Sequence, residues 1–314
     1  MKAYIAAASA AALSVGLVVA APTMADVFSF STGNPDGKLG SLSQPPGPGL
    51  ETETADDFVL TDATVISRAI VHGLIASGSD VSDIKQVEVE VYHVFPEDSD
   101  TTRKPAVVTR VNSPADIEIG AATRDSGASP ATLSFGTILV EKSFKVLNTV
   151  VNKINPAPAQ FTGGEGPATG EEVEIDITFT PPIFLPAGHY FFRPEVQVSG
   201  GFLYLSAPRP ILSPPGTPFP AGFTDLQSWI RNAKLSPDWS RIGTDITGQG
   251  PFNAAFSLAG DTIPGAGTPG QPNCHGKTIS AMAHEFGGIK HAALSLGFFS
   301  VHALQNGVSK FCQP

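Results

Sequence analysis

The chain has 314 residues, and 41% of them are hydrophobic, which is ample for a packed core and argues against a wholly disordered protein. Its formal net charge of −10 at pH 7 argues against a nucleic-acid-binding protein, because phosphates need a footprint of Lys and Arg. The 28 prolines and 32 glycines indicate many short strands joined by turns.

Residues 1–25 have the pattern of a secretory signal peptide. Lys2 supplies the positive charge, an uncharged apolar run ends at Ala21, and a small-residue cleavage site follows at Ala25. We expect cleavage after Ala25, with Ala21 as the second choice. The alternative is a retained membrane anchor, but the run is short and rich in alanine for a spanning helix. The sequence therefore predicts a secreted or cell-envelope-associated protein with no transmembrane span in the mature chain.

Residues 26–260 are predicted to form one mainly β domain. Apolar and acidic residues alternate over Val87–Val91 and Glu172–Ile177, so each strand should have one buried face and one solvated acidic face. Because such strands recur with no amphipathic helix between them, we expect an antiparallel β-sandwich of jelly-roll type, with about nine to eleven strands. Further strands are expected at Asp57–Leu60, Thr64–Ile75, Leu133–Val140, Tyr190–Val198, Phe202–Ser206 and Phe252–Leu258.

Two segments depart from this strand pattern. Asp225–Arg231 is predicted to make a helical turn or two. Residues 261–272 are rich in Pro and Gly and lack apolar periodicity, so we expect a linker there. The body should then fold independently of whatever follows the linker.

Residues 273–314 are predicted to form a helical C-terminal module. Apolar residues recur at helical spacing in three stripes, with Gly287-Gly288 and Gly297 between them and Ser300 placed to cap the last helix. The stripes run over Ile279–Phe286, Ile289–Leu296 and Val301–Phe311.

The only two cysteines, Cys274 and Cys312, bracket this module. In an exported chain we expect them to form a disulfide, which in the simplest model offsets about 4 kcal/mol of chain entropy. A zinc site built from both cysteines and neighbouring histidines is the alternative.

Two sets of residues resemble a known class of proteins. Asn273-Cys274-His275-Gly276, followed by Phe311-Cys312, is similar to a C-terminal module of uncharacterised exported bacterial proteins. Phe28–Gly37 and Glu53–Phe58 resemble the β-rich body of such proteins. The resemblance implies export and a two-part chain, and it implies no activity, cofactor or catalytic residue.

Candidate chemistry in the sequence is sparse, and we predict no catalytic residue, metal ligand or cofactor. His284-Glu285 lacks the second histidine of a zinc-protease helix, and no nucleophile elbow or dinucleotide-binding motif occurs. His72 and His93 fall among apolar neighbours and are expected to be packed or rim residues. Three acidic groups are candidate calcium ligands, with solvated turn caps as the alternative: Asp56-Asp57, Glu97–Asp100 and Glu171-Glu172.

Aromatic residues are the remaining candidates for contact with a ligand or partner, with core packing as the alternative. The candidates are Tyr190, Phe192, Trp229 and Trp239 in the body and Phe298 and Phe299 in the tail. We therefore expect a non-catalytic binding or surface-associated protein. The alternatives are a structural envelope or matrix protein attached through its tail, and an extracellular hydrolase whose site leaves no sequence motif.

Overall fold

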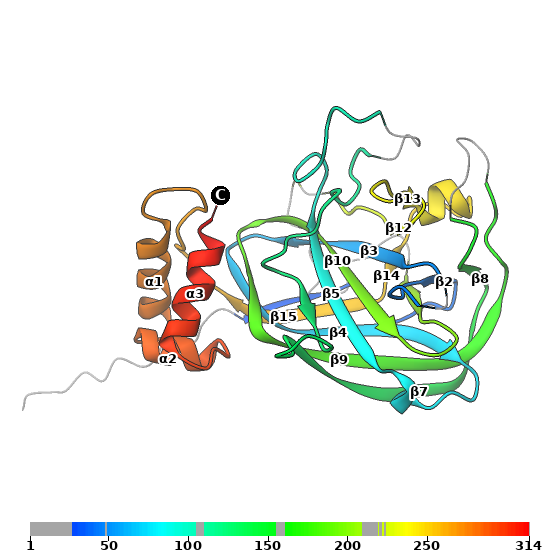
Figure 1. Ribbon diagram of the computed structural model, residues 1–314, viewed down its shortest axis with the longest axis horizontal. Coiled ribbons are helices and arrows are strands. Elements are labelled where there is room, and N and C mark those ends of the chain that lie inside the picture. The colour runs from blue at the N-terminus through cyan, green and yellow to red at the C-terminus, as the bar shows by residue number, and fades with distance from the viewer. Residues whose placement is uncertain are drawn as a thin grey trace, which may run out of the picture.

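The computed structural model describes residues 27–47, 49–104, 110–154, 161–208, 219, 222 and 224–313. The predicted signal peptide lies outside these residues. The chain is mainly β, with two sheets and a small helical region at the C-terminal end, and Figure 1 shows the C-terminal helices gathered at one end of the strands. No helix in the described part is long and apolar enough to cross a membrane.

The larger sheet has nine strands, of which β1, β15, β4, β11, β2 and β8 lie side by side in that order. β9 pairs with β4 and β7, and all pairs are antiparallel except β2 with β8. The strands are β1 (Val27–Ser31), β2 (Leu39–Leu42), β4 (Thr64–Ala76), β7 (Leu133–Val146), β8 (Asn148–Val150), β9 (Ala168–Leu185), β11 (Leu203–Ala207), β14 (Asn253–Ala254) and β15 (Phe256–Thr262).

The second sheet has six strands in the order β13, β12, β3, β10, β5 and β6. The described residues thus hold fifteen strands, more than the expected number, because several short strands of two to four residues add to the long ones. The strands of this sheet are β3 (Thr52–Leu60), β5 (Gln86–His93), β6 (Arg124–Asp125), β10 (Gly188–Gln197), β12 (Trp229–Asn232) and β13 (Ser240–Arg241).

One apolar core is shared by the two sheets. The alternating valines of Val87–Val91 in β5 and the apolar residues of Val173–Ile177 in β9 are buried in the same cluster, which confirms the predicted apolar faces. The rings of Phe192 in β10 and Phe256 in β15 stack 5.2 Å apart and join one sheet to the other. The inner faces therefore follow the alternation in the sequence.

The predicted solvated face of β5 is wrong. Glu90 is buried, because residues that follow β5 and β12 in the chain cover this outer face. The Trp239 ring packs edge-on against Tyr92 at 5.5 Å, and its indole Nε1 donates to the carbonyl of Ala115 at 3.1 Å. The predicted helical turn at Asp225–Arg231 is also wrong, since this segment leads into β12, and the helical turn is instead a π-helix at Ile242–Ile246.

The tail forms three helices where the apolar stripes predict them: α1 (Cys274–Glu285), α2 (Ile289–Ser295) and α3 (Val301–Phe311). The Ser300 side chain accepts a hydrogen bond from the Ala303 N–H at 3.0 Å, so the predicted cap is confirmed. Cys274 and Cys312 form the predicted disulfide, with 5.7 Å between their Cα atoms, and the zinc alternative is therefore wrong.

The tail packs against the body. Its apolar core includes Val65 and Ile263, and the Phe184 ring of β9 stacks on Phe311 with 3.9 Å between centroids. β15 continues to Thr262, so the predicted linker begins as strand. These contacts favour a tail that supports the body, whereas the sequence predicts independence, and a truncation separates the two expectations.

Candidate functional site

A cluster of charged residues lies on the outer face of the second sheet. Strand register explains it, because Arg231 of β12 pairs with Glu53 of β3, and Arg193 of β10 pairs with Glu90 of β5. Glu195 follows on β10 two residues further, opposite Glu88. Alternate residues of a strand point to the same face, so these side chains share one surface.

Two arginines bind the carboxylates of this cluster. Arg193 Nη2 lies 2.5 Å from Glu90 Oε2 and 3.2 Å from Glu53 Oε1, and its Nη1 lies 2.7 Å from Glu195 Oε2. Arg231 also binds Glu53, with Nη2 donating to Oε1 at 3.1 Å and Nε in contact with Oε2. Breaking such a buried network by removing one partner is strongly destabilising, so these arginines hold the carboxylates in place.

Aromatic residues cover the cluster. The Tyr92 hydroxyl donates to Glu90 and accepts from Arg231 Nη2 at 3.0 Å. The Arg231 guanidinium lies over the Trp239 ring, 4.3 Å from its centroid. Burial lowers the pKa of Arg231 to about 10, so the side chain remains a cation at neutral pH.

Negative charge exceeds positive charge in this cluster. Five carboxyl groups, from Glu51, Glu53, Glu88, Glu90 and Glu195, accompany two guanidinium groups in the described part of this face, which leaves an excess of three negative charges when all are ionised. Burial raises the pKa of Glu88 to about 7 and that of Glu195 to about 7. The site therefore has capacity for further positive charge.

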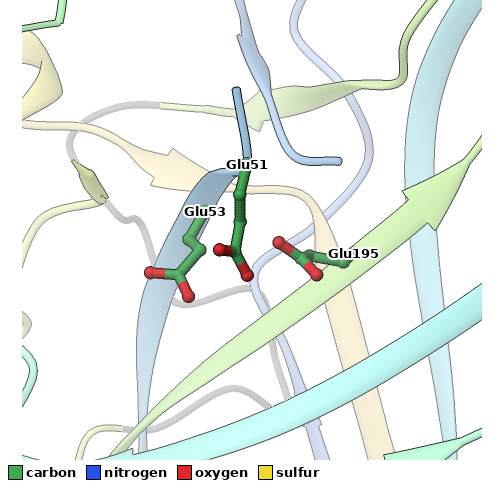
Figure 2. Close-up of side chains that lie close together, drawn as sticks. All are labelled: Glu51, Glu53 and Glu195. Carbon is green, nitrogen blue, oxygen red and sulfur yellow. The ribbon is translucent and has the colours of Figure 1, made fainter. Parts of the chain in front are cut away.

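Three of these carboxylates converge. Oxygens of Glu51, Glu53 and Glu195 all lie within 4.8 Å of one another. Figure 2 shows Glu51 and Glu53 coming from the start of β3, and the Glu195 carboxylate facing Glu51 from β10. Glu195 is 2% exposed, whereas Glu51 is half-buried and opens the group toward solvent.

A groove of about 590 Å³ lies near the start of β3, and none of the three glutamates lines it. Leu50 and Thr52, the neighbours of Glu51 in the chain, both line it. Polar side chains dominate the rest of the lining together with a few aliphatic ones, and they come from the end of β2, the segment after β8 and the end of β12. They include Gln44, Asn152, Lys153, Thr162, Asn232 and Lys234.

A second buried group of titratable side chains lies further along β3. His189 Nε2 is 2.5 Å from Asp57 Oδ2, and the Leu226 N–H donates to the same oxygen at 3.1 Å. Burial and the charges of Asp56 and Asp225 raise the pKa of Asp57 well above its ordinary value. Burial also raises the pKa of Asp225 to about 7 and lowers that of His189 to about 4. These pKa directions favour a neutral His189 next to neighbouring aspartic acids that titrate as a coupled group.

The aromatic candidates of the body are all buried. Tyr190 and Phe192 lie in the core between the sheets, and Tyr190 donates its hydroxyl to the Pro186 carbonyl at 3.0 Å. Trp229 and Trp239 pack together on the outer face of the second sheet. In their present positions, none of the four presents its ring to a ligand.

The two tail candidates differ from each other. Phe298 is buried in the tail core, and Phe299 is 81% exposed. Both line a groove of about 360 Å³ between α3 and the body, together with Phe184 and Lys310. Phe299 therefore remains a candidate contact with a partner.

Of the histidines named from the sequence, His72 lies within β4, His93 ends β5, and His284 lies in the tail. His72 Nδ1 is 3.6 Å from Glu172 Oε1, and burial lowers the pKa of His72. His93 Nδ1 is 2.5 Å from Asp98 Oδ2. His284 lies in the last turn of α1.

The acidic groups named from the sequence as candidate calcium ligands lie apart and accept separate hydrogen bonds. Asp56 accepts from the Ala254 N–H at 2.7 Å on the inner side of β3, whereas Asp57 faces the outer side. Asp100 accepts from Thr102, and Glu171 from the Gly78 N–H at 3.4 Å. Within the described ranges, the only convergence of three ligand residues is at Glu51, Glu53 and Glu195.

This convergence is not among the predictions made from the sequence. Glu51 and Glu53 are far from Glu195 in the chain, and β3 and β10 bring them together. One signal was present, because Glu195 and Arg193 interrupt an otherwise apolar strand pattern over Tyr190–Val198. Paired charges within an apolar strand indicate a buried ion pair.

No family model, curated protein or solved structure matches this chain.

Proposed function

We propose that this protein is an exported, non-catalytic binding protein that takes a polar ligand of the saccharide class in the 590 Å³ groove beside Glu51. The observation that carries the proposal is the lining of this groove. The Gln44 and Asn152 amides offer donors and acceptors, and the Thr52 hydroxyl, which donates to the Leu50 carbonyl at 3.2 Å, offers an acceptor. Such groups suit the hydroxyl groups of a sugar. Export rests on the sequence of residues 1–25.

Several groups in the groove have unused hydrogen-bonding capacity. Within the part of the chain that the structure describes, the Asn152 side-chain amide makes no hydrogen bond, and Asn232 uses its oxygen but not its amide nitrogen. Aliphatic Leu42 and Leu50 in the same lining suit the apolar face of a sugar ring. Such a mixed lining orients a ligand through a few polar contacts.

We further propose that the two sheets form a sandwich of jelly-roll type. The shared core between them and the antiparallel pairing support this architecture. In such a fold, ligand sites are commonly supplied by loops at the ends of the strands. The groove lies at such an edge, where β2 leads to β3 and where β12 ends.

The test is a glycan and polymer binding screen of the mature protein, followed by titration of the best ligand against variants. We expect Asn152→Ala and Lys234→Ala each to weaken binding by up to about tenfold, the effect of one lost hydrogen bond. Asn306→Ala removes an exposed amide in the tail and is the matched control. The proposal fails if the screen gives no ligand, or if the groove variants bind as the control does.

An extracellular hydrolase is the second candidate function. The group around Asp57, Asp225 and His189 favours it, because neighbouring carboxyl groups with raised pKa are suited to acid and base chemistry. Asp57 is completely buried, however, which keeps a substrate away from its carboxyl group. Turnover of a chromogenic glycoside or ester that is abolished in Asp225→Asn would support this candidate over the first.

A further inference from the structure

The Glu51, Glu53 and Glu195 group carries two observations that point to a missing positive charge. Among the described residues, the cluster has three more carboxyl groups than guanidinium groups when Glu51 and Glu88 are counted with the three that pair with Arg193 or Arg231. In addition, Glu195 Oε1 is buried and has no hydrogen-bond partner in the described residues, although Oε2 is paired with Arg193. A buried carboxylate oxygen without a partner is costly, so something must compensate it.

We infer that Glu51, Glu53 and Glu195 hold a divalent cation, and that this cation is calcium. The three residues offer only carboxylate oxygens, the ligands of hard cations. Their oxygens lie within 4.8 Å of one another, close enough for one ion to contact all three at calcium–oxygen distances of about 2.3–2.6 Å. A divalent ion would offset two of the three excess charges.

Calcium suits the group better than magnesium. Magnesium requires near-ideal octahedral geometry at about 2.0–2.1 Å and keeps much of its water, whereas calcium accepts irregular and incomplete protein cages. Here Arg231 and Arg193 already bind Glu53, which limits how far that carboxylate can turn toward an ion. Glu51 is half-buried, so water can complete the coordination on its side.

The competition from the arginines also predicts a weak site. We expect a dissociation constant of about 10⁻⁴–10⁻³ M, in the range of extracellular calcium modules. An exported protein meets calcium at such concentrations more readily than a protein inside the cell. The inference stands apart from the saccharide groove, because it requires only the ion.

Isothermal titration of purified mature protein with CaCl₂ tests the inference, with MgCl₂ and matched ionic strength in NaCl as comparisons. We expect one calcium ion per chain, weaker binding of magnesium, and a higher unfolding midpoint in calcium. Glu51→Gln should reduce calcium affinity by at least about tenfold, since it removes one ligand charge. Glu51 makes no side-chain hydrogen bond or ion pair in the described residues, so this variant should fold. Glu141→Gln, an exposed carboxylate on β7, is the matched control.

Three outcomes would overturn the inference. If titration with CaCl₂ gives no heat of binding and calcium does not shift the unfolding midpoint, the excess negative charge is neutralised by protons. Equal affinity of Glu51→Gln and wild type would place the ion elsewhere. Equal or tighter binding of magnesium would refute the choice of calcium.

Discussion

The C-terminal tail and the β-rich body differ in what they bury. The tail core consists of apolar side chains such as Met282, Leu304 and Val308, closed by one disulfide. The body buries an apolar core between its sheets and, on the outer face of the second sheet, a network of charges around Arg193 and Glu195. Apolar burial needs no specific partner, whereas each buried charge needs one. Burial in the tail therefore stabilises the fold without specific partners. On the outer face of the body, burial is favourable only where each charged side chain has a partner.

The junction between these two regions gives the largest expected effect. A chain that ends at Pro264 keeps β15 whole but uncovers Val65, Phe184 and Ile263, which pack against the tail. Each buried side chain of this size contributes about 1.5–3 kcal/mol. We expect the unfolding midpoint of the truncated chain to fall by more than about ten degrees, measured by calorimetry.

The control for this truncation is the full mature chain under the same conditions. A truncated chain that melts within about two degrees of the full chain would contradict the expectation. It would show instead that the body is independent, as the linker composition of residues 261–272 predicts.

The two regions also differ in how well the sequence predicts them. The three helices and the Ser300 cap follow from local spacing, and the Cys274–Cys312 disulfide follows from the presence of only two cysteines in a chain expected to be exported. A helix stripe contacts residues a few positions away in sequence, so its pattern is visible in a short window. The inner faces of β5 and β9 were predictable for the same reason.

The outer face of the second sheet was not predictable in this way. Alternation shows that Glu90 points away from Val89 and Val91, but not that Trp239 and its neighbours cover that face. The convergence of Glu51 with Glu195 depends on strand order, which a single strand pattern does not specify. Polar residues on one face of a strand indicate a solvent-exposed face only where no other segment of the chain packs over that face.

The buried carboxyl groups of the body should make its stability depend on pH. Burial raises the pKa of Asp225 to about 7, so between about pH 4 and pH 7 the folded chain holds a proton that the unfolded chain has lost. The free energy of unfolding should therefore fall as the pH rises through this window. Asp225→Asn removes this dependence. We therefore expect the unfolding midpoint of the variant, relative to that of wild type, to rise between pH 4 and pH 8.

Thermal unfolding at several pH values measures this gain. Asp62→Asn, at an exposed position in the turn between β3 and β4, is the matched control and should follow wild type at every pH. A difference between Asp225→Asn and wild type that stays constant with pH would show that the Asp225 carboxyl group does not titrate in this window.

The smallest expected effect on stability is at Phe299, and it asks whether the tail has a role besides stability. Phe299 is 81% exposed, so Phe299→Ser should change the free energy of unfolding by no more than about 0.5 kcal/mol. Its neighbour Phe298 is buried against Gly307, and Phe298→Ser should cost about 3 kcal/mol or more and loosen the tail. If the tail attaches the protein to the cell surface or matrix, Phe299→Ser should reduce the retained fraction while the midpoint stays unchanged. Phe161→Ser, at an exposed phenylalanine of the body, is the control. Equal retention of the two variants would rule out Phe299 as the attachment contact, because an exposed ring that binds a partner loses that contact when it becomes a serine.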